Sequence, residues 1–223
     1  MPYKPSSEEE EKFLKNFDPA KYQNPGVAAD TAVFAVKEKE LFLLLIERGG
    51  YPYKGCWALP GGFVDMDEDI LGSAKRELEE EAGLRIDYIE QAAVWDKPDR
   101  DPRQRVITVS CIALIDDTAS IKAGDDAAKA EWFKINSYSK AEGEEQTTVS
   151  FSLSGPAQIA AKVAYPNNRI QQITCVQSGG LAFDHAESIV TSIELLKRRV
   201  EIIAPLSFGK QKADEAARII NNI

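Results

Sequence analysis

Five ionisable residues stand at fixed spacing between Gly62 and Leu84, in the segment GFVDMDEDILGSAKRELEEEAGL. The segment fits the pattern G-x5-E-x7-R-E-U-x-E-E-x-G-U, in which U is a bulky aliphatic residue. Its ionisable positions are Glu68, Arg76, Glu77, Glu80 and Glu81. Every fixed position is filled, and at ordinary residue abundances a chance match at one start is on the order of 1 in 10^9.

The spacing predicts three carboxylates on one helix face. A helix turns by about 100° per residue, so Glu77, Glu80 and Glu81 point within about a third of the circumference of one another. Two such charges about 6 Å apart repel by roughly 2–3 kcal/mol at an effective dielectric constant near 20, and a divalent cation reverses that sign. Oxygen donors without nearby Cys or His favour Mg²⁺ or Mn²⁺ over Zn²⁺. We therefore predict a metal site with these three ligands, and a diphosphate that binds the metal.

A solvated acidic helix face is the alternative explanation for the same run of charges. It does not account for the glycines at both ends of the segment. Nor does it account for Arg76, four residues before Glu80, where a guanidinium can orient that carboxylate. The segment also holds eight acids against two bases, in a chain with a net charge of −9. We interpret the segment as a site.

The surrounding sequence predicts an α/β fold that would position this segment. Two β-type runs from Ala28, joined by a charged turn at 37–40, are typical of a hairpin. A glycine- and proline-rich loop leads into the segment, whose helix is expected from about Asp69 to Ala82 with Gly83 as its C-terminal stop. Further strands are expected at 86–95, 104–114 and 130–135.

Four arginines are candidate substrate-binding residues. The loop DKPDRDPRQR lies between two of the expected strands, and one more arginine ends the hairpin. A guanidinium binds phosphate oxygens through two parallel hydrogen bonds, so these groups would complement an acidic metal site. A solvated polar loop is the alternative interpretation. The four residues are Arg48, Arg100, Arg103 and Arg105.

Residues 137–180 are expected to form an inserted small β-subdomain that shapes the pocket or a subunit interface. TTVSFSL, AQIAAKVAY and RIQQITCVQ are typical of three short strands separated by turns. A helix is then predicted from Asp184, with Glu187 completing a capping box. His185, the only histidine, is expected to have a structural role near this cap.

The chain divides into three parts in this interpretation. Residues 1–24 form an N-terminal arm, in which Ser7 and Glu10 predict a capped helix with Phe13, Leu14 and Phe17 on one side, expected to pack. Residues 25–200 form the main domain, and residues 201–223 form a C-terminal helical tail.

Composition favours a compact enzyme of the reducing cytoplasm. The chain has 223 residues, 43% hydrophobic content and a pI near 4.9, which argues against general affinity for nucleic acid or anionic membrane. We find no run of 18 apolar residues and no apolar centre of a signal peptide. Cys56, Cys111 and Cys175 lack a paired spacing, so free buried thiols are expected.

The segment 62–84, the preceding WALPGGF, and the later DRDPRQR and LAFDHAE resemble the Nudix hydrolase family. The likeness is to the subgroup of ADP-ribose pyrophosphatases and the related repressors of NAD metabolism. It implies an α/β/α sandwich around a mixed β-sheet, and Mg²⁺-dependent cleavage of a nucleoside diphosphate linked to another group. ADP-ribose, giving AMP and ribose 5-phosphate, is the expected substrate, with other nucleotide sugars or dinucleotides as alternatives.

The resemblance also implies residue roles and a homodimer. Glu77, Glu80 and Glu81 would bind the metal, Glu68 would lie near it, and Arg76 would orient its ligands. The general base stays open between the motif and a later segment. Its later candidates are Asp125, Asp126, Glu131 and residues 142–145.

Two other classes of protein remain as alternatives. In an ADP-ribose-sensing transcriptional regulator, a Nudix domain would bind the ligand and a winged helix would bind DNA. The 38 residues after His185 carry a net charge of +1, which we expect to be too little chain for that motif. A structural interaction protein that uses the inserted strands would not depend on Glu80 or Glu81.

Overall fold

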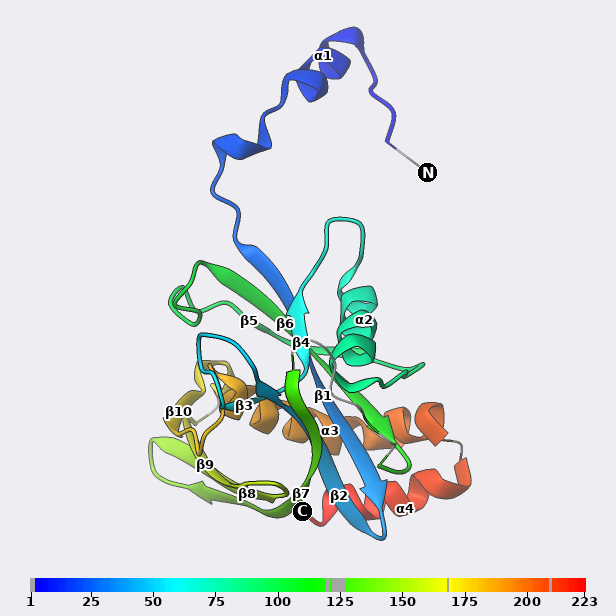
Figure 1. Ribbon diagram of the computed structural model, residues 1–223, viewed down its shortest axis with the longest axis vertical. Helices are drawn as coiled ribbons and strands as arrows, with labels where there is room; N and C mark the ends of the chain where they lie inside the picture. Colours follow the sequence, from blue (N-terminus) through cyan, green and yellow to red (C-terminus); the bar gives the residue numbers. More distant parts are fainter. Residues whose placement is uncertain (1–2, 119–120, 122–126, 168, 209) are drawn as a thin grey trace.

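The computed structural model describes residues 3–118, 121, 127–167, 169–208 and 210–223 (Figure 1). Within these residues ten strands form one sheet in the order β10-β9-β8-β7-β2-β1-β6-β5, with β3 paired to β2 and β4 paired to β1. The strands are β1 (Gly26–Lys37), β2 (Glu40–Arg48), β3 (Trp57–Ala58), β4 (Gly61–Phe63), β5 (Glu90–Trp95), β6 (Val106–Ile115), β7 (Ala127–Glu142), β8 (Gln146–Ser154), β9 (Gln158–Pro166) and β10 (Thr174–Gln177). The helices are α1 (Glu8–Asn16), α2 (Ile70–Ala82), α3 (His185–Phe208) and α4 (Lys210–Asn221), with short 3-10 turns η1 (Pro19–Lys21) and η2 (Ile170–Gln172).

The centre of the sheet is β1, which runs antiparallel to β2 and parallel to β6. Its side chains are buried on both faces: Phe34 belongs to one apolar core and Val33 to the other. A strand covered on both sides needs apolar residues at successive positions, which explains its nearly continuous apolar run. The predicted hairpin forms, with Lys37 opposite Glu40.

Helices cover both faces of this mixed sheet. On one face α2 buries Ala74, Leu78 and Ala82 against the sheet. On the other, α3 buries an apolar stripe that includes Ile189 and Ile193, and α4 packs beside it (Figure 1). Each fully buried aliphatic side chain of this size contributes about 1.5–3 kcal/mol to folding. The predicted α/β class and sandwich are confirmed.

The strands expected within 137–180 are present as β8, β9 and β10, and they continue the main sheet. The long strand β7 explains the continuity, because its first half pairs with β2 and its second half pairs with β8. In β8 the buried side chains alternate with partly exposed ones, and Val149, Phe151 and Leu153 join the core that contains α3. The extension therefore widens the apolar surface on which α3 rests.

The two ends of α2 lie where the sequence predicts them. The Asp69 carboxylate caps the helix by accepting the Gly72 N–H at 2.7 Å. At the other end Gly83 has φ 63°, a left-handed conformation that costs a residue with a Cβ atom more than glycine. Residues close in the chain therefore account for where this helix begins and ends.

The start of α3 differs from the predicted capping box. The Asp184 carboxylate pairs with Arg100, and the Glu187 carboxylate accepts the backbone N–H of Cys175 at 2.9 Å. Both acids therefore connect the helix to other elements instead of closing its first turn. The helix itself forms, and α4 lies within residues 201–223, which are expected to form a helical tail.

The N-terminal arm does not pack as expected. Figure 1 shows it extending from β1 away from the sheet. No residue of α1 is buried, and the side of α1 that carries Phe13 and Leu14 leaves them 64% and 46% exposed. Ser7 does cap the helix, but the Glu10 carboxylate binds the N–H and hydroxyl of Ser6 rather than returning to Ser7.

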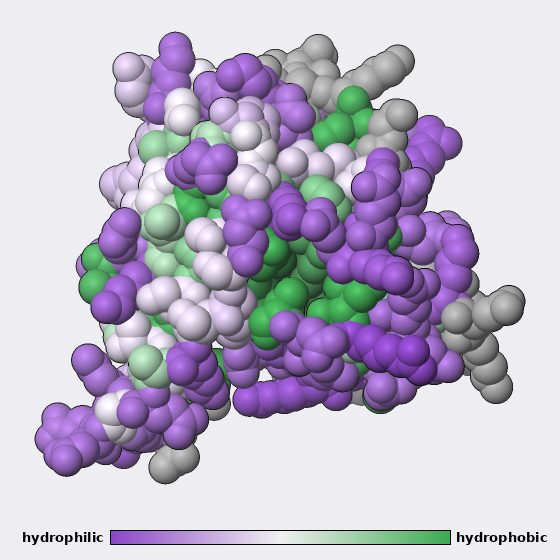
Figure 2. Space-filling view, turned by 90° about the horizontal axis from the view of Figure 1, so that it is seen from below, coloured by the Kyte–Doolittle hydropathy of each residue, from purple (hydrophilic) through white to green (hydrophobic). Residues whose placement is uncertain are grey.

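One face of the molecule combines a hydrophilic border with an apolar centre (Figure 2). Figure 2 shows the face seen from below covered by hydrophilic side chains, with apolar ones gathered in a recess near its centre.

All three cysteines are free thiols, but only Cys111 is buried, so the expectation of buried thiols is wrong for exposed Cys175 and half-buried Cys56. None of the helices in the described ranges combines the length and apolarity needed to cross a membrane.

Candidate functional site

The carboxylates of α2 line the side of the helix next to β4. Because Leu78 and its buried neighbours face the sheet, Glu77 and Glu81 lie at the margin of the buried side. The Glu77 side chain is 13% exposed, whereas that of Glu80 is 58% exposed. On the predicted shared face, the exposure of the carboxylates to solvent therefore increases from Glu77 to Glu80.

Arg76 connects the acids of the motif to one another. Its guanidinium forms two hydrogen bonds with Glu68, at 2.7 and 3.1 Å. A third nitrogen donates to both Glu77, at 2.8 Å, and Glu80, at 2.9 Å. These bonds hold the pKa of Glu68 down at about 2. One arginine thus serves three carboxylates, which leaves the cluster with excess negative charge.

Glu81 has a different environment. Its carboxylate accepts the N–H of Gly61 at 2.8 Å. Burial, with Glu77 and Asp30 nearby, raises the pKa of Glu81 to about 8, and burial likewise raises the pKa of Glu77. A cation placed between these groups would favour their ionised forms.

Gly61 and Gly62 allow β4 to approach these acids closely. A Cβ atom on Gly62 would overlap the Glu77 carboxylate, and one on Gly61 would overlap the backbone of β1. A larger residue at Gly61 would push β4 away from β1, and one at Gly62 would displace the Glu77 carboxylate. The two glycines that begin the motif therefore have a steric reason.

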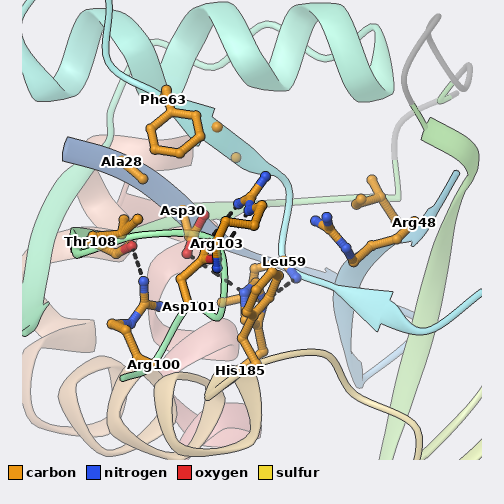
Figure 3. Close-up of a pocket in the computed structure, with 15 residues that line it drawn as sticks. Ala28, Asp30, Arg48, Leu59, Phe63, Arg100, Asp101, Arg103, Thr108 and His185 are labelled. Carbon is orange, nitrogen blue, oxygen red and sulfur yellow. Dashed lines mark hydrogen bonds and ion pairs between the residues drawn. The ribbon is translucent and has the colours of Figure 1, made fainter. Parts of the chain in front are cut away.

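A pocket opens beside these acids, between β1, β4, the loop before β6 and the start of α3 (Figure 3). It combines charged groups with two aromatic rings. Its charged and aromatic lining residues are Asp30, Arg48, Phe63, Arg100, Asp101, Arg103, Phe183 and His185.

Two of the three arginines of the loop at 96–105 are held by acids of the same protein. Arg100 forms two hydrogen bonds with Asp184, at 2.5 and 2.8 Å, and is only 5% exposed. Arg103 is bound in the same way by Asp101. The Arg105 guanidinium donates to the backbone carbonyl of Lys97 and does not line the pocket. Of the three, Arg103 is the one that both lines the pocket and is well exposed, at 45%.

Arg48 is the lining arginine without a carboxylate partner among the described residues. Its Nε donates to the carbonyl of Pro52 at 2.9 Å, and its guanidinium lies 4.9 Å from the centre of the Phe183 ring. Phe183 has φ 46°, a left-handed conformation that is strained for a bulky residue. Strain of this kind is found most often where a side chain must be held at a functional site.

Asp30 and His185 enter the pocket although the motif does not contain them. The imidazole Nδ1 of His185 accepts the N–H of Leu59 at 2.8 Å, and its Nε2 lies 3.7 Å from Asp30. Burial lowers the pKa of His185 to about 4, so the ring is neutral at pH 7. The structural role expected for His185 is observed, since it connects the start of α3 to the segment between β3 and β4.

Candidates for the general base separate in the structure. Asp125 and Asp126 lie outside the described residues. The segment 142–145 forms the turn between β7 and β8, and Glu142 lines a different hollow with Lys140 and Arg169. Glu131 lies two residues before buried Phe133 on β7. The two side chains therefore share one face of the sheet, the face opposite to α2.

The donor set on α2 fits a hard divalent cation. Carboxylate oxygens suit Mg²⁺ or Mn²⁺, and Mg²⁺ binds through one or two carboxylates while keeping several waters. Among the residues that the structure describes, no three His, Cys, Asp or Glu side chains are grouped so that they could hold a metal ion, so Glu77, Glu80 and Glu81 are not assembled as a three-ligand site in this arrangement. Arg76 stands between Glu77 and Glu80, so the open arrangement would have to exchange its hydrogen bonds for a cation.

Comparison with known families identifies the domain that contains this site. Residues 25–151, more than half of the chain, match the family model described as the NUDIX domain. The chain belongs to the NUDIX family. The matched region contains the α2 carboxylates, the loop at 96–105 and the central strands of the sheet.

Two curated relatives of this NUDIX chain differ in their described activity. It is 41% identical over 133 residues to an ADP-ribose pyrophosphatase of Methanocaldococcus jannaschii, across 58% of this chain and 75% of that protein. It is 38% identical over 128 residues to the ADPR responsive transcriptional repressor NtrR of Acinetobacter baylyi, across 56% of this chain. The match spans about half, 51%, of the repressor's length.

Among solved structures, a MutT/nudix family protein from Enterococcus faecalis is similar over nearly the whole chain. The TM-score is 0.71 at 27% identity, and the alignment covers 99% of this chain and 88% of the other. The likeness therefore reaches beyond the family match, into the sheet extension and the C-terminal helices.

Proposed function

We propose that this NUDIX protein is a Mg²⁺-dependent hydrolase that cleaves the diphosphate of a nucleoside diphosphate linked to another group. ADP-ribose is the substrate we favour, with AMP and ribose 5-phosphate as products. The observation that carries the proposal is the complete carboxylate set of α2 beside a pocket lined by arginines. The 41% identity to an ADP-ribose pyrophosphatase supports this choice of substrate.

The residues would divide the work by charge. Glu77, Glu80 and Glu81 would hold Mg²⁺, or Mn²⁺ in its place, with Glu68 and Arg76 positioning them. When bound, the metal supplies charge neutralisation for the diphosphate and lowers the pKa of a coordinated water. Arg48 and Arg103 would bind the phosphate oxygens. Water adds to one phosphorus, the bridging P–O bond breaks, and a carboxylate accepts the proton released from the water.

The test is a substrate panel with Mg²⁺ that contains ADP-ribose, NADH, nucleotide sugars, diadenosine polyphosphates and nucleoside triphosphates. The wild type is compared with Glu81→Gln and with Glu79→Gln, an acid of the same helix that pairs with Arg85 outside the pocket. We expect ADP-ribose to give AMP and ribose 5-phosphate, with activity lost only in Glu81→Gln. Absence of turnover on the whole panel would contradict the hydrolase.

A second candidate is an ADP-ribose-sensing transcriptional regulator, which the 38% identity to the repressor favours. The acidic pI and the intact acids of α2 argue for turnover instead, and we expect no nucleic acid partner. Tight, salt-dependent binding to a defined operator, released by ADP-ribose, together with no hydrolysis, would move the regulator to first place.

We also propose a homodimer in the reducing cytoplasm. The exposed apolar side chains of the arm, among them Phe13 and Phe17, support a partner surface, and the free cysteines agree with a reducing compartment. Sedimentation at micromolar concentration should give the mass of two chains, and a shift toward the monomer for Phe13→Ser with Phe17→Ser. A wild type that sediments only as a monomer would contradict the dimer.

A further inference from the structure

Asp30 is a buried carboxylate in the middle of the pocket. It lies on β1 opposite Gly61 of β4, and its side chain is 15% exposed. Figure 3 shows Asp30 together with Arg103, Leu59 and His185, with Arg48 to one side and Phe63 to the other. Its ion-pair contact within the described residues is Nε2 of His185, 3.7 Å from Oδ2, which is too long for a hydrogen bond.

His185 cannot satisfy this carboxylate. Because its Nδ1 accepts the Leu59 N–H, the hydrogen-bond network places the ring proton on Nε2. The ring is neutral at pH 7, so it presents one distant N–H to Asp30 and no positive charge. No hydrogen bond reaches either Asp30 carboxylate oxygen from the residues that the structure describes, although Asp30 lines the pocket.

Among the described residues, none of the three arginines that line the pocket forms an ion pair with Asp30, and Arg48 donates to the carbonyl of Pro52 instead. Arg100 is held by Asp184, and Arg103 is held by Asp101. Burial accordingly raises the pKa of Asp30 to about 7. A buried acceptor without a donor costs free energy, and in native proteins such a group is usually satisfied by water or a ligand. The pocket therefore contains a carboxylate in need of hydrogen-bond donors.

The sign of its charge restricts what can lie there. At a pH above its pKa Asp30 is ionised and repels phosphate oxygens, which have no donor, so the part of the ligand that it then meets is neutral. Two adjacent sugar hydroxyls are donors that can reach the two oxygens of one carboxylate. An acid binds ribose hydroxyls in this way in dinucleotide-binding folds of a different architecture.

We propose that Asp30 binds the ribose hydroxyls of the substrate and selects ligands whose sugar diol is unmodified. This inference rests on the proposed function for the class of ligand. The diphosphate then lies toward Arg48 and α2, and a sugar that carries an extra phosphate on the diol is rejected by charge.

The test pairs protein variants with ligand variants. Calorimetry with Mg²⁺ measures binding of an ADP-ribose analogue whose bridging oxygen is replaced by a methylene group, so that it cannot be cleaved at that bond. The wild type and Asp30→Asn are titrated with this analogue, with its 2′-deoxyadenosine form, with its hypoxanthine form, and with α,β-methylene ADP, which lacks the second ribose.

We expect Asp30→Asn to weaken binding of the full analogue by about 10–100-fold, the usual effect of losing hydrogen bonds to a charged group. The difference in affinity between the wild type and Asp30→Asn should vanish for one sugar-modified ligand. That ligand is the 2′-deoxyadenosine form if Asp30 binds the adenosine ribose, and α,β-methylene ADP if Asp30 binds the second ribose. A difference that persists for both sugar-modified ligands, or that vanishes only for the hypoxanthine form, overturns the assignment. So does equal binding of the full analogue by both proteins.

Two controls keep the outcome interpretable. The melting temperature of Asp30→Asn at pH 8 should equal or exceed that of the wild type, because the variant removes a charge that burial disfavours. Hydrolysis of ADP-ribose by the wild type is measured separately. If the effect of Asp30→Asn depends on the diol but the wild type does not hydrolyse ADP-ribose, the proposed hydrolase is wrong and the role of Asp30 stands. If the wild type hydrolyses ADP-ribose but the effect of Asp30→Asn does not depend on the diol, only the role of Asp30 is wrong.

Discussion

The acidic and basic sides of the pocket follow opposite rules of charge pairing. On α2, one arginine, Arg76, serves Glu68, Glu77 and Glu80. In the loop at 96–105, Arg100 and Arg103 each have a carboxylate of their own. The acidic side therefore keeps a surplus of negative charge, while the basic side is largely neutralised within the protein.

This difference indicates which groups are free to bind a ligand. A surplus of carboxylates on a half-buried face is costly unless a cation joins it, which supports the proposed metal site on the acidic side. A buried arginine in a two-bond pair with an acid is committed to structure. Arg48, which has no carboxylate partner among the described residues, is the arginine best placed to receive phosphate.

The largest effect should come from removing a carboxylate on the acidic side. Glu77→Gln removes one charge that the metal needs, and we expect kcat for ADP-ribose with saturating Mg²⁺ to fall by about 10^3–10^4-fold. Glu79→Gln, on the same helix, should keep wild-type kcat. Equal activity of all three proteins would show that the acidic surplus does not serve catalysis.

Breaking the buried pair on the basic side should affect stability first. Arg100→Met leaves Asp184 buried without its partner, and we expect the free energy of unfolding, measured with urea, to fall by about 3–5 kcal/mol. The exposed pair of Arg85 and Glu79 supplies the control: Arg85→Met should cost less than about 1 kcal/mol. A stable Arg100→Met with weak substrate binding would instead make Arg100 a ligand for phosphate.

Removing the shared arginine should loosen the acidic side without destroying it. Arg76→Ala leaves all carboxylates in place but unpositioned, and we expect the affinity for Mn²⁺ to fall by about 10–100-fold, as for other residues that orient metal ligands. Lys75→Ala, one residue away on the exposed side of the helix, is the control. Tighter binding in Arg76→Ala would mean that the arginine competes with the metal.

The smallest effect separates two arginines of the basic side. Arg48→Met should raise KM for ADP-ribose by about 10-fold with little change in kcat, because it removes a contact made equally in the ground and transition states. Arg105→Met, outside the pocket, should leave KM unchanged. The opposite ranking would place the phosphates on the far side of the loop at 96–105.

The sequence is sufficient for α2 because both of its ends depend on residues close in the chain. Asp69 caps it through Gly72, and Gly83 ends it by adopting a conformation that glycine favours. The same holds for the strands, whose apolar patterns are local. The sequence did not predict that β8 joins the main sheet. β8 is joined to it through the long strand β7, whose second half is a polar stretch with no clear strand pattern.

The pocket depended on long-range pairs that no local pattern contains. Arg100 and Asp184 are 84 positions apart, and Leu59 and His185 are 126 apart. Asp30 was missed because it interrupts an apolar run that is typical of a buried strand. An acid in such a run is costly unless it has a purpose, and that cost is the signal in the sequence that could have identified it.

The central claim is that the surplus of acid on α2 binds a divalent cation. Mn²⁺ titration followed by electron paramagnetic resonance, without any nucleotide, tests it directly in the wild type, Glu81→Gln and Glu79→Gln. We expect saturable Mn²⁺ binding in the wild type and in Glu79→Gln, and loss of that binding in Glu81→Gln. Binding that is absent from all three proteins, or equal in all three, would contradict it.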